Sequence, residues 1–66
     1  MPANSPTEFV ITSSVRTAIV QALDGQPTAT TELLAALDAS ESAVYDALAS
    51  LRERGIARET DSGWAL

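Results

Sequence analysis

The stretch "ASESAVYDALASLRERG", residues 39–55, decides how the rest of this chain is interpreted. Ser40 is a favourable N-cap, because its hydroxyl can accept a backbone N–H from the first helical turn. Gly55 stands where a glycine commonly ends a helix. The apolar residues between them recur at the i, i+3, i+4, i+7 spacing of one helix face: Val44, Ala47, Leu48 and Leu51. The stretch therefore predicts a helix over residues 41–54 with one apolar face.

Residues 13–25, "SSVRTAIVQALDG", predict an earlier helix of the same kind. Thr12 or Ser13 can cap its start. Gly25 suits the left-handed position after a helix, and Pro27 prevents continuation. The apolar stripe again has helical spacing and consists of Val15, Ala18, Ile19, Ala22 and Leu23.

A shorter helix is predicted between these two, over residues 30–38, "TTELLAALD". Thr30 is its plausible cap, and Glu32 in the first turn suits the positive end of the helix dipole. Asp38 tolerates a left-handed backbone better than most residues, so it is expected to turn the chain sharply.

The residue pattern at the C-terminus differs from that of the helices. The C-terminal segment "IARETDSGWAL" predicts a β-hairpin, with strands over residues 56–59 and 64–66 around the four-residue connection "TDSG". Trp64 and Leu66 share one face by period-2 alternation and can close over the helices together with Ile56.

At the N-terminus, residues 1–8 lack periodicity and are expected to form a disordered tail. "FVIT", residues 9–12, could be a short strand or a lead-in segment that packs against the first helix. Residues 9–66 then form one domain.

The composition argues against several functions. The 66 residues suffice for one small domain, and they include no Cys, His or Lys. The commonest metal ligands, catalytic bases and nucleophiles are therefore missing, and no enzyme activity, metal site, cofactor or small-molecule site is predicted. The longest apolar run, "LLAAL", is too short to span a membrane, and no signal-peptide core follows Met1. A cytoplasmic protein is expected.

The charge balance is acidic, with a formal net charge of −5, and all four cations are arginines. An acidic, lysine-free chain rich in Ala, Thr and Ser resembles the proteins of extreme halophiles, in which negative charge maintains solubility in concentrated salt. The alternative is an acidic domain from a cell of ordinary salt content.

Three helices, a tight turn between the second and third, and then a hairpin resemble the winged helix-turn-helix family. "TELLAALDASESAVYDALASLRERGIA" is similar to the recurring signature of that family, with a leucine-rich helix, a Ser cap and an Arg-Gly stop. "FVITSSVRTAIVQAL" looks like the first helix of archaeal regulators of the ArsR/MarR/TrmB-like kind. The resemblance implies an α+β fold, a three-helix bundle followed by a two-stranded β-hairpin wing. It also implies a sequence-specific DNA-binding transcription regulator from a haloarchaeon.

The resemblance further implies how double-stranded DNA would be held. The helix over residues 41–54 would lie in the major groove with its N-terminal half near the base edges, and the wing would rest on phosphates. Carried over by position, the contacting residues of that helix would be Ser40, Ser42, Ala43, Tyr45, Asp46 and Ala49. The arginines that could reach phosphates are Arg16, Arg52 and Arg58. Structural alternatives exist, because cations near a helix end suit the dipole and Arg16 could pair with a carboxylate.

Acidic residues on the same face count against DNA binding. Phosphates would repel Glu41 and Asp46, and the hairpin tip has no cation. A carboxylate can, however, accept a hydrogen bond from cytosine N4, and counterion release gives little affinity in a salt-rich cell. The alternative is a winged-helix module that binds a basic protein and no DNA. A palindromic DNA site would require a homodimer.

Overall fold

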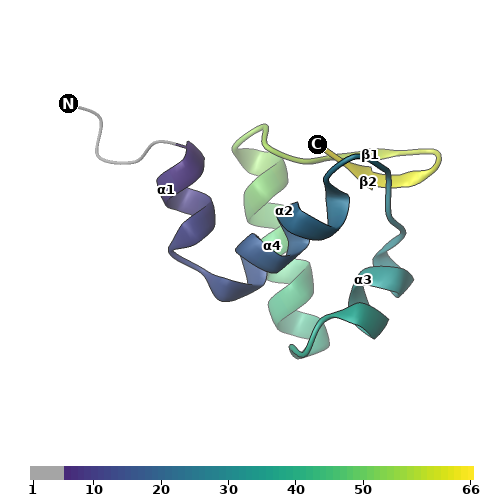
Figure 1. Cartoon of the computed structure of the whole chain (residues 1–66), viewed down its shortest axis with the longest axis horizontal. Helices are drawn as coiled ribbons and strands as arrows, with labels where there is room; N and C mark the ends of the chain where they lie inside the picture. Colours follow the sequence, from purple (N-terminus) through teal and green to yellow (C-terminus); the bar gives the residue numbers. More distant parts are fainter. Residues whose placement is uncertain (1–5) are drawn as a thin grey trace.

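Four helices and a two-stranded hairpin make up residues 6–66, the part that this computed structural model describes (Figure 1). The elements are α1 (Pro6–Ile11), α2 (Ser14–Leu23), α3 (Thr30–Ala36), α4 (Glu41–Glu53), β1 (Arg58–Thr60) and β2 (Gly63–Ala65). The α+β class is confirmed, with one helix more than the sequence pattern predicts. Of the expected tail, residues 1–5 lie outside the described part, whereas residues 6–8 belong to α1.

Helix α1 replaces the strand or lead-in expected over "FVIT". Pro6 occupies its first position, where the fixed φ and missing N–H of proline suit a helix start. Six residues are too few for a stable helix in isolation, so contacts must hold it. Arg16 Nε donates to the Phe9 carbonyl at 2.9 Å, and the Thr17 hydroxyl donates to the Val10 carbonyl at 3.0 Å. Side chains of α2 thus satisfy the carbonyls at the end of α1.

Helix α2 begins and ends as predicted. The Ser13 hydroxyl caps it by accepting the Arg16 N–H at 3.2 Å. After Leu23 the chain leaves the helix, and Gly25 takes a φ of +89°. The helix packs against α4, and the two form the centre of the molecule (Figure 1).

The hydrophobic core lies where α2, α3, α4 and the hairpin meet. It includes the whole apolar stripe predicted for α4, which confirms the prediction of which face of that helix is buried. Within the described part of the chain, no polar or charged side chain is buried. The buried residues are Ile19, Leu23, Leu33, Val44, Ala47, Leu48, Leu51, Ala57 and Trp64.

The turn between α3 and α4 differs in one respect from the prediction. Leu37 leaves α3 with φ −95° and ψ 139°, and no non-glycine residue among those described has a positive φ. Asp38 therefore does not use the left-handed conformation, since extended backbone at Leu37 already redirects the chain. Ser40 caps α4 as predicted, because its hydroxyl accepts the Ala43 N–H at 3.2 Å.

The hairpin is tighter than expected. β1 and β2 are antiparallel, with Thr60 opposite Gly63, so the connection is the two residues Asp61 and Ser62 instead of four. The Thr60 hydroxyl stabilises this turn by donating to the Gly63 carbonyl at 2.7 Å. Trp64 is 7% exposed, as expected of a core residue, but Leu66 is 45% exposed and does not join it.

A third segment pairs with the hairpin. The backbone N–H of Thr28 donates to the Trp64 carbonyl at 2.8 Å, and the Trp64 N–H returns the bond at 2.8 Å. A Cβ on Gly63, whose φ is +119°, would lie 2.6 Å from the Thr28 carbonyl carbon, so glycine is required for this approach.

The Trp64 indole N–H also donates to the Thr30 hydroxyl at 3.0 Å. The prediction that Thr30 caps α3 is therefore wrong: Ala29 is the N-cap and makes no side-chain capping bond. We call Thr28, Thr30, Gly63 and Trp64 the sheet corner, because together they fix the hairpin to the start of α3.

Candidate nucleic-acid interface

The outward face of α4 is the surface on which the sequence places its DNA-contacting residues. Ser42, Asp46, Ala49 and Arg52 are exposed, and Tyr45 is 50% exposed. The opposite face of the same helix is buried in the core. Packing therefore holds α4 from behind and leaves a row of side chains available to a partner.

The start of α4 is shaped by two hydroxyls. Ser40 and Ser42 are exposed, and their Oγ atoms lie 3.4 Å apart. Ala43, half-buried beside them, contributes its backbone N–H to the Ser40 cap. The helix N-terminus carries partial positive charge, which favours a phosphate, but Glu41 in the first turn opposes it.

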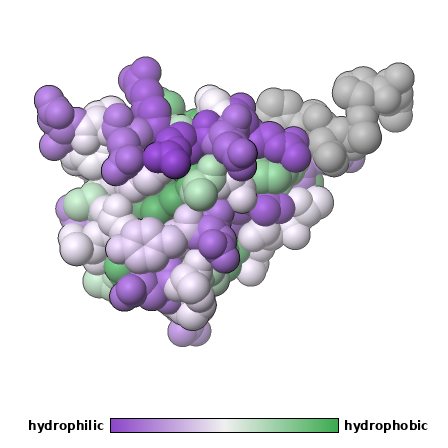
Figure 2. Space-filling model, turned by 180° about the vertical axis from the view of Figure 1, so that it is seen from behind, coloured by the Kyte–Doolittle hydropathy of each residue, from purple (hydrophilic) through white to green (hydrophobic). Residues whose placement is uncertain are grey.

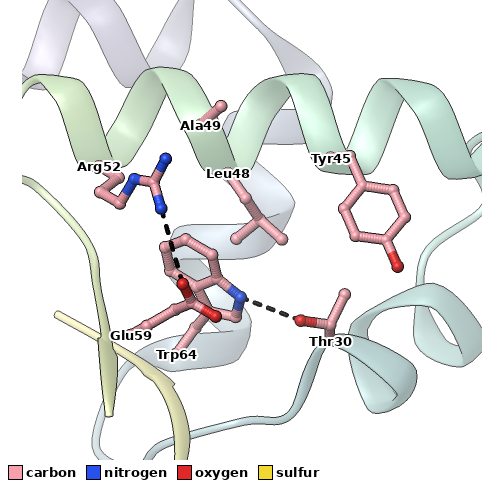
Figure 3. A pocket seen from close by; sticks show the side chains of 7 residues that line it. All are labelled: Thr30, Tyr45, Leu48, Ala49, Arg52, Glu59 and Trp64. Carbon is pink, nitrogen blue, oxygen red and sulfur yellow. Dashed lines mark hydrogen bonds and ion pairs between the residues drawn. The ribbon is translucent and has the colours of Figure 1, made fainter.

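A hollow of about 240 Å³ separates α4 from the hairpin. Figure 3 shows the Trp64 indole at its centre below Leu48, with Tyr45 toward one end and Arg52 toward the other. The residues that line it are Thr30, Tyr45, Leu48, Ala49, Arg52, Glu59 and Trp64. Its floor is apolar and its edges are polar, so it suits a partner that has both kinds of surface.

Arg52 forms an ion pair across this hollow. Its Nη1 lies 3.6 Å from Oε1 of Glu59, and the two side chains are 59% and 63% exposed (Figure 3). An exposed pair at this distance contributes at most about 1 kcal/mol. Arg52 is among the contact residues expected from the sequence, whereas Glu59 is not. The available signal was the hairpin register, which pairs Glu59 with the buried Trp64.

Arg16 lies apart from the residues that line the hollow. Its guanidinium carbon is 4.0 Å from the centroid of the Phe9 ring, and that of Arg54 is 4.1 Å from the same centroid. Arg16 also donates to the Phe9 carbonyl and, at 3.0 Å, to the Thr12 hydroxyl. We call Phe9, Arg16 and Arg54 the aromatic clasp. Its bonds are to a carbonyl, a hydroxyl and a ring, and the carboxylate partner considered for Arg16 is not among them.

Arg58 is exposed on β1, next to Glu59. Neighbouring residues of a strand point to opposite faces, so Arg58 points away from the hollow toward which Glu59 turns. The tip residues Asp61 and Ser62 are exposed as well. The hairpin thus offers one cation on its outer side and a carboxylate at its tip.

The side of the molecule formed by α4 and the hairpin has no excess of positive charge. Its exposed cations Arg52 and Arg58 are accompanied by the exposed carboxylates Glu41, Asp46, Glu59 and Asp61. Figure 2 shows hydrophilic side chains gathered along the upper edge of the molecule, with hydrophobic surface below them. Any nucleic acid held here must be recognised through hydrogen bonds and shape more than through net charge.

Within residues 6–66, no group of three or more His, Cys, Asp or Glu residues is placed to hold a metal ion. Nor does this part of the chain contain a helix that is long and apolar enough to cross a membrane.

Comparison with known proteins identifies the domain. Residues 13–59, well over half of the chain, match the family model described as "Bacterial regulatory protein, arsR family". No curated protein and no solved structure gives a significant match. The matched range covers α2, α3, α4 and the first two residues of β1. It includes the helix, turn and helix that present the outward face of α4. The chain thus belongs to the ArsR family of winged helix-turn-helix proteins, which are DNA-binding transcription regulators.

Proposed function

We propose that this chain recognises a specific sequence of double-stranded DNA, with α4 lying in the major groove. One observation carries the proposal, namely that the outward face of α4 is exposed along its length while its other face is locked into the core. A helix held in this way can enter a groove without giving up its own packing. Membership of a DNA-binding family supports the same reading.

The base-reading roles follow from side-chain chemistry. The hydroxyls of Ser42 and Tyr45 can donate to or accept from base edges, and the Ala49 methyl group suits contact with a thymine methyl. Asp46 can accept only, so cytosine N4 is its matching partner. Ser40 and Ala43 are at the helix start, where the partial positive charge of the helix favours a phosphate, although the Ala43 N–H itself donates to the Ser40 hydroxyl.

The phosphate contacts are assigned to Arg52 and Arg58. Both are exposed, one at the end of α4 and the other on the hairpin, so they can bracket a groove from two elements. Arg16 is left out of this assignment, because the aromatic clasp holds its guanidinium against α1. Two phosphate contacts per domain give a shallow salt dependence, with a logarithmic slope of about −2.

A second copy of the domain completes the proposal. One α4 reads only a few base pairs, and regulators of this architecture reach adequate specificity by reading two half-sites with two copies. A palindromic site about one helical turn between half-site centres is therefore expected.

The test is selection of random duplex DNA by the purified protein, in molar potassium chloride and separately in low salt. The enriched duplex is then titrated into isotope-labelled protein, and backbone amide shifts are mapped. We expect a recurrent motif and shifts that concentrate on residues 40–52. Failure to enrich any motif at either salt concentration would remove the proposal and point to a protein partner.

Single substitutions test the individual roles. Tyr45→Phe and Ser42→Ala should each weaken binding to the enriched duplex by about tenfold, because a lost base contact is worth about 1–3 kcal/mol. Ser14→Ala is the matched control, since Ser14 is also an exposed serine in the first turn of a helix. It should leave the affinity unchanged.

A further inference from the structure

The hollow between α4 and the hairpin holds a single pair of opposite charges. Of the residues that line it, Arg52 is the one cation and Glu59 the one anion. Figure 3 shows the two side chains reaching toward each other from α4 and from β1. Arg52, which is proposed above to bind a DNA phosphate, therefore already has an ion-pair partner within the protein.

The fold, and not chance rotamers alone, brings the two groups together. Arg52 follows Leu51, a fully buried core residue, so the position of its backbone is fixed. Glu59 is opposite Trp64 in the hairpin register, and Trp64 is tied to Thr28 by two backbone bonds. The sheet corner thus sets where the Glu59 carboxylate stands relative to α4.

We propose that Glu59 competes with DNA phosphate for Arg52 and so sets how tightly the α4 face binds DNA. This inference rests on the function proposed above. In the free protein Glu59 neutralises Arg52, and in the complex a phosphate takes its place. Glu59 is then a residue that tunes affinity without contacting a base.

The geometry of the pair suits such an exchange. At 3.6 Å the contact is longer than a charge-assisted hydrogen bond, and both side chains are more than half exposed. Little is lost on breaking it. A phosphate presents several acceptor oxygens to the planar guanidinium and can bind it through two parallel bonds.

The other arginines are not placed for the same exchange. Arg16 and Arg54 lie over the Phe9 ring, and Arg58 is on the opposite face of β1 from Glu59. The competition is therefore specific to Arg52, and this specificity makes the proposal testable.

The experiment is a double-mutant cycle on the enriched duplex, with affinities measured for the full chain as wild type, Glu59→Gln, Arg52→Gln and the double variant. Glu59→Gln should tighten binding about two- to fivefold when Arg52 is present, the range expected from an exposed ion pair. In the Arg52→Gln background it should change the affinity no more than the removal of any other exposed carboxylate from this surface does. Circular dichroism melts of each variant confirm that the proteins compared are folded.

Glu53→Gln is the matched control, because it removes the same charge from an exposed residue beside Arg52 that is not its ion-pair partner. Its effect should be equal in both backgrounds. In the free protein, Glu59→Gln should also shift the Arg52 Nε–H resonance, whereas Glu53→Gln should not.

Three outcomes of these measurements would contradict the proposals. If Glu59→Gln tightens binding equally with and without Arg52, the effect comes from general repulsion between the carboxylate and DNA. The proposed competition for Arg52 is then refuted. If Glu59→Gln weakens binding, Glu59 positions Arg52 for DNA, and the proposal is again wrong. If the wild-type protein binds no duplex at all, the proposed function itself fails, which the wild-type measurement shows separately.

Discussion

Arg52 and Arg54 are two residues apart, yet they serve opposite sides of the molecule. Arg54 lies over the Phe9 ring with Arg16, on the side where α1 meets the helical core. Arg52 faces the hollow beside the hairpin and pairs loosely with Glu59. On the α1 side, the contacts of Arg16 and Arg54 with Phe9 stabilise the fold. On the hairpin side, Arg52 can exchange its carboxylate partner for another anion. In a chain with only four cations, this division limits how many can contact DNA.

The largest expected effect concerns the hairpin side, which has to be anchored before Arg52 and Glu59 can meet. Gly63→Ala should lower the free energy of unfolding by about 2–4 kcal/mol, because the new Cβ would clash with Thr28 and φ is positive. Denaturant unfolding measures this change. The control is Gly25→Ala, where φ is also positive but no atom lies within 4 Å. It should lose only about 1–2 kcal/mol, and equal losses would show that the close approach to Thr28 is unimportant.

The second largest loss of stability is expected at the aromatic clasp. Phe9→Ala should lower the free energy of unfolding by about 1–2 kcal/mol, since two cation–π contacts and partly buried apolar surface are lost. Phe9→Leu keeps most of the apolar surface and should lose about half as much. Thermal melts of the three proteins test this order. A Phe9→Leu protein as unstable as Phe9→Ala would place the whole effect on the ring–arginine contacts.

A direct comparison of the two arginines comes third. Arg54→Gln should destabilise the protein by about 0.5–1 kcal/mol, the value of a cation–π contact at an exposed site. Arg52→Gln should change stability by less than about 0.5 kcal/mol, because its ion pair is exposed. Chemical denaturation of both variants in one buffer gives the difference. Equal destabilisation would show that Arg52 contributes as much to stability as Arg54 does, and it would contradict the difference proposed between the two sides.

The smallest effect is on the salt dependence of DNA binding. Arg52→Gln should reduce the steepness of the logarithmic salt slope by about 0.9 for each bound copy of the domain, the share of one phosphate contact. Arg54→Gln should leave the slope unchanged, because the clasp keeps that guanidinium against Phe9. Affinities for the enriched duplex across a salt series check both expectations. A slope that falls for Arg54→Gln would place the clasp within reach of DNA.

Much of the fold could be predicted from local patterns. The α4 stripe and the Ser40 cap are predicted correctly, and Ser13 is one of the two caps predicted for α2, because helical spacing and hydroxyl caps depend on residues within a turn of each other. Helix α1 was missed, although Pro6 at its first position is a helix-start signal. Its apolar residues were too few to show a period, and its stability depends on Arg16 and Thr17 of the next helix.

The candidate site was predictable only in part. Tyr45 and Ala49 follow from the helical wheel of α4, but their place beside the hairpin does not. Glu59 does not stand out in the sequence, because its role depends on a strand register and on the approach of Trp64 to Thr28. The register is a local pattern, but the contact between Trp64 and Thr28 joins residues far apart in the chain, and no short-range pattern encodes it.

The order of residues alone therefore settles the α+β class, the amphipathic α4 and the scarcity of cations. Each of these depends on composition or on neighbours within one or two turns. Packing decides the rest: which arginines are held, which carboxylate faces Arg52, and that Thr30 binds Trp64 instead of capping a helix. Phe9, Arg16 and Arg54 meet only because α1, α2 and the end of α4 converge. A side chain's role here depends on which surfaces the core brings together, and only the folded chain defines those surfaces.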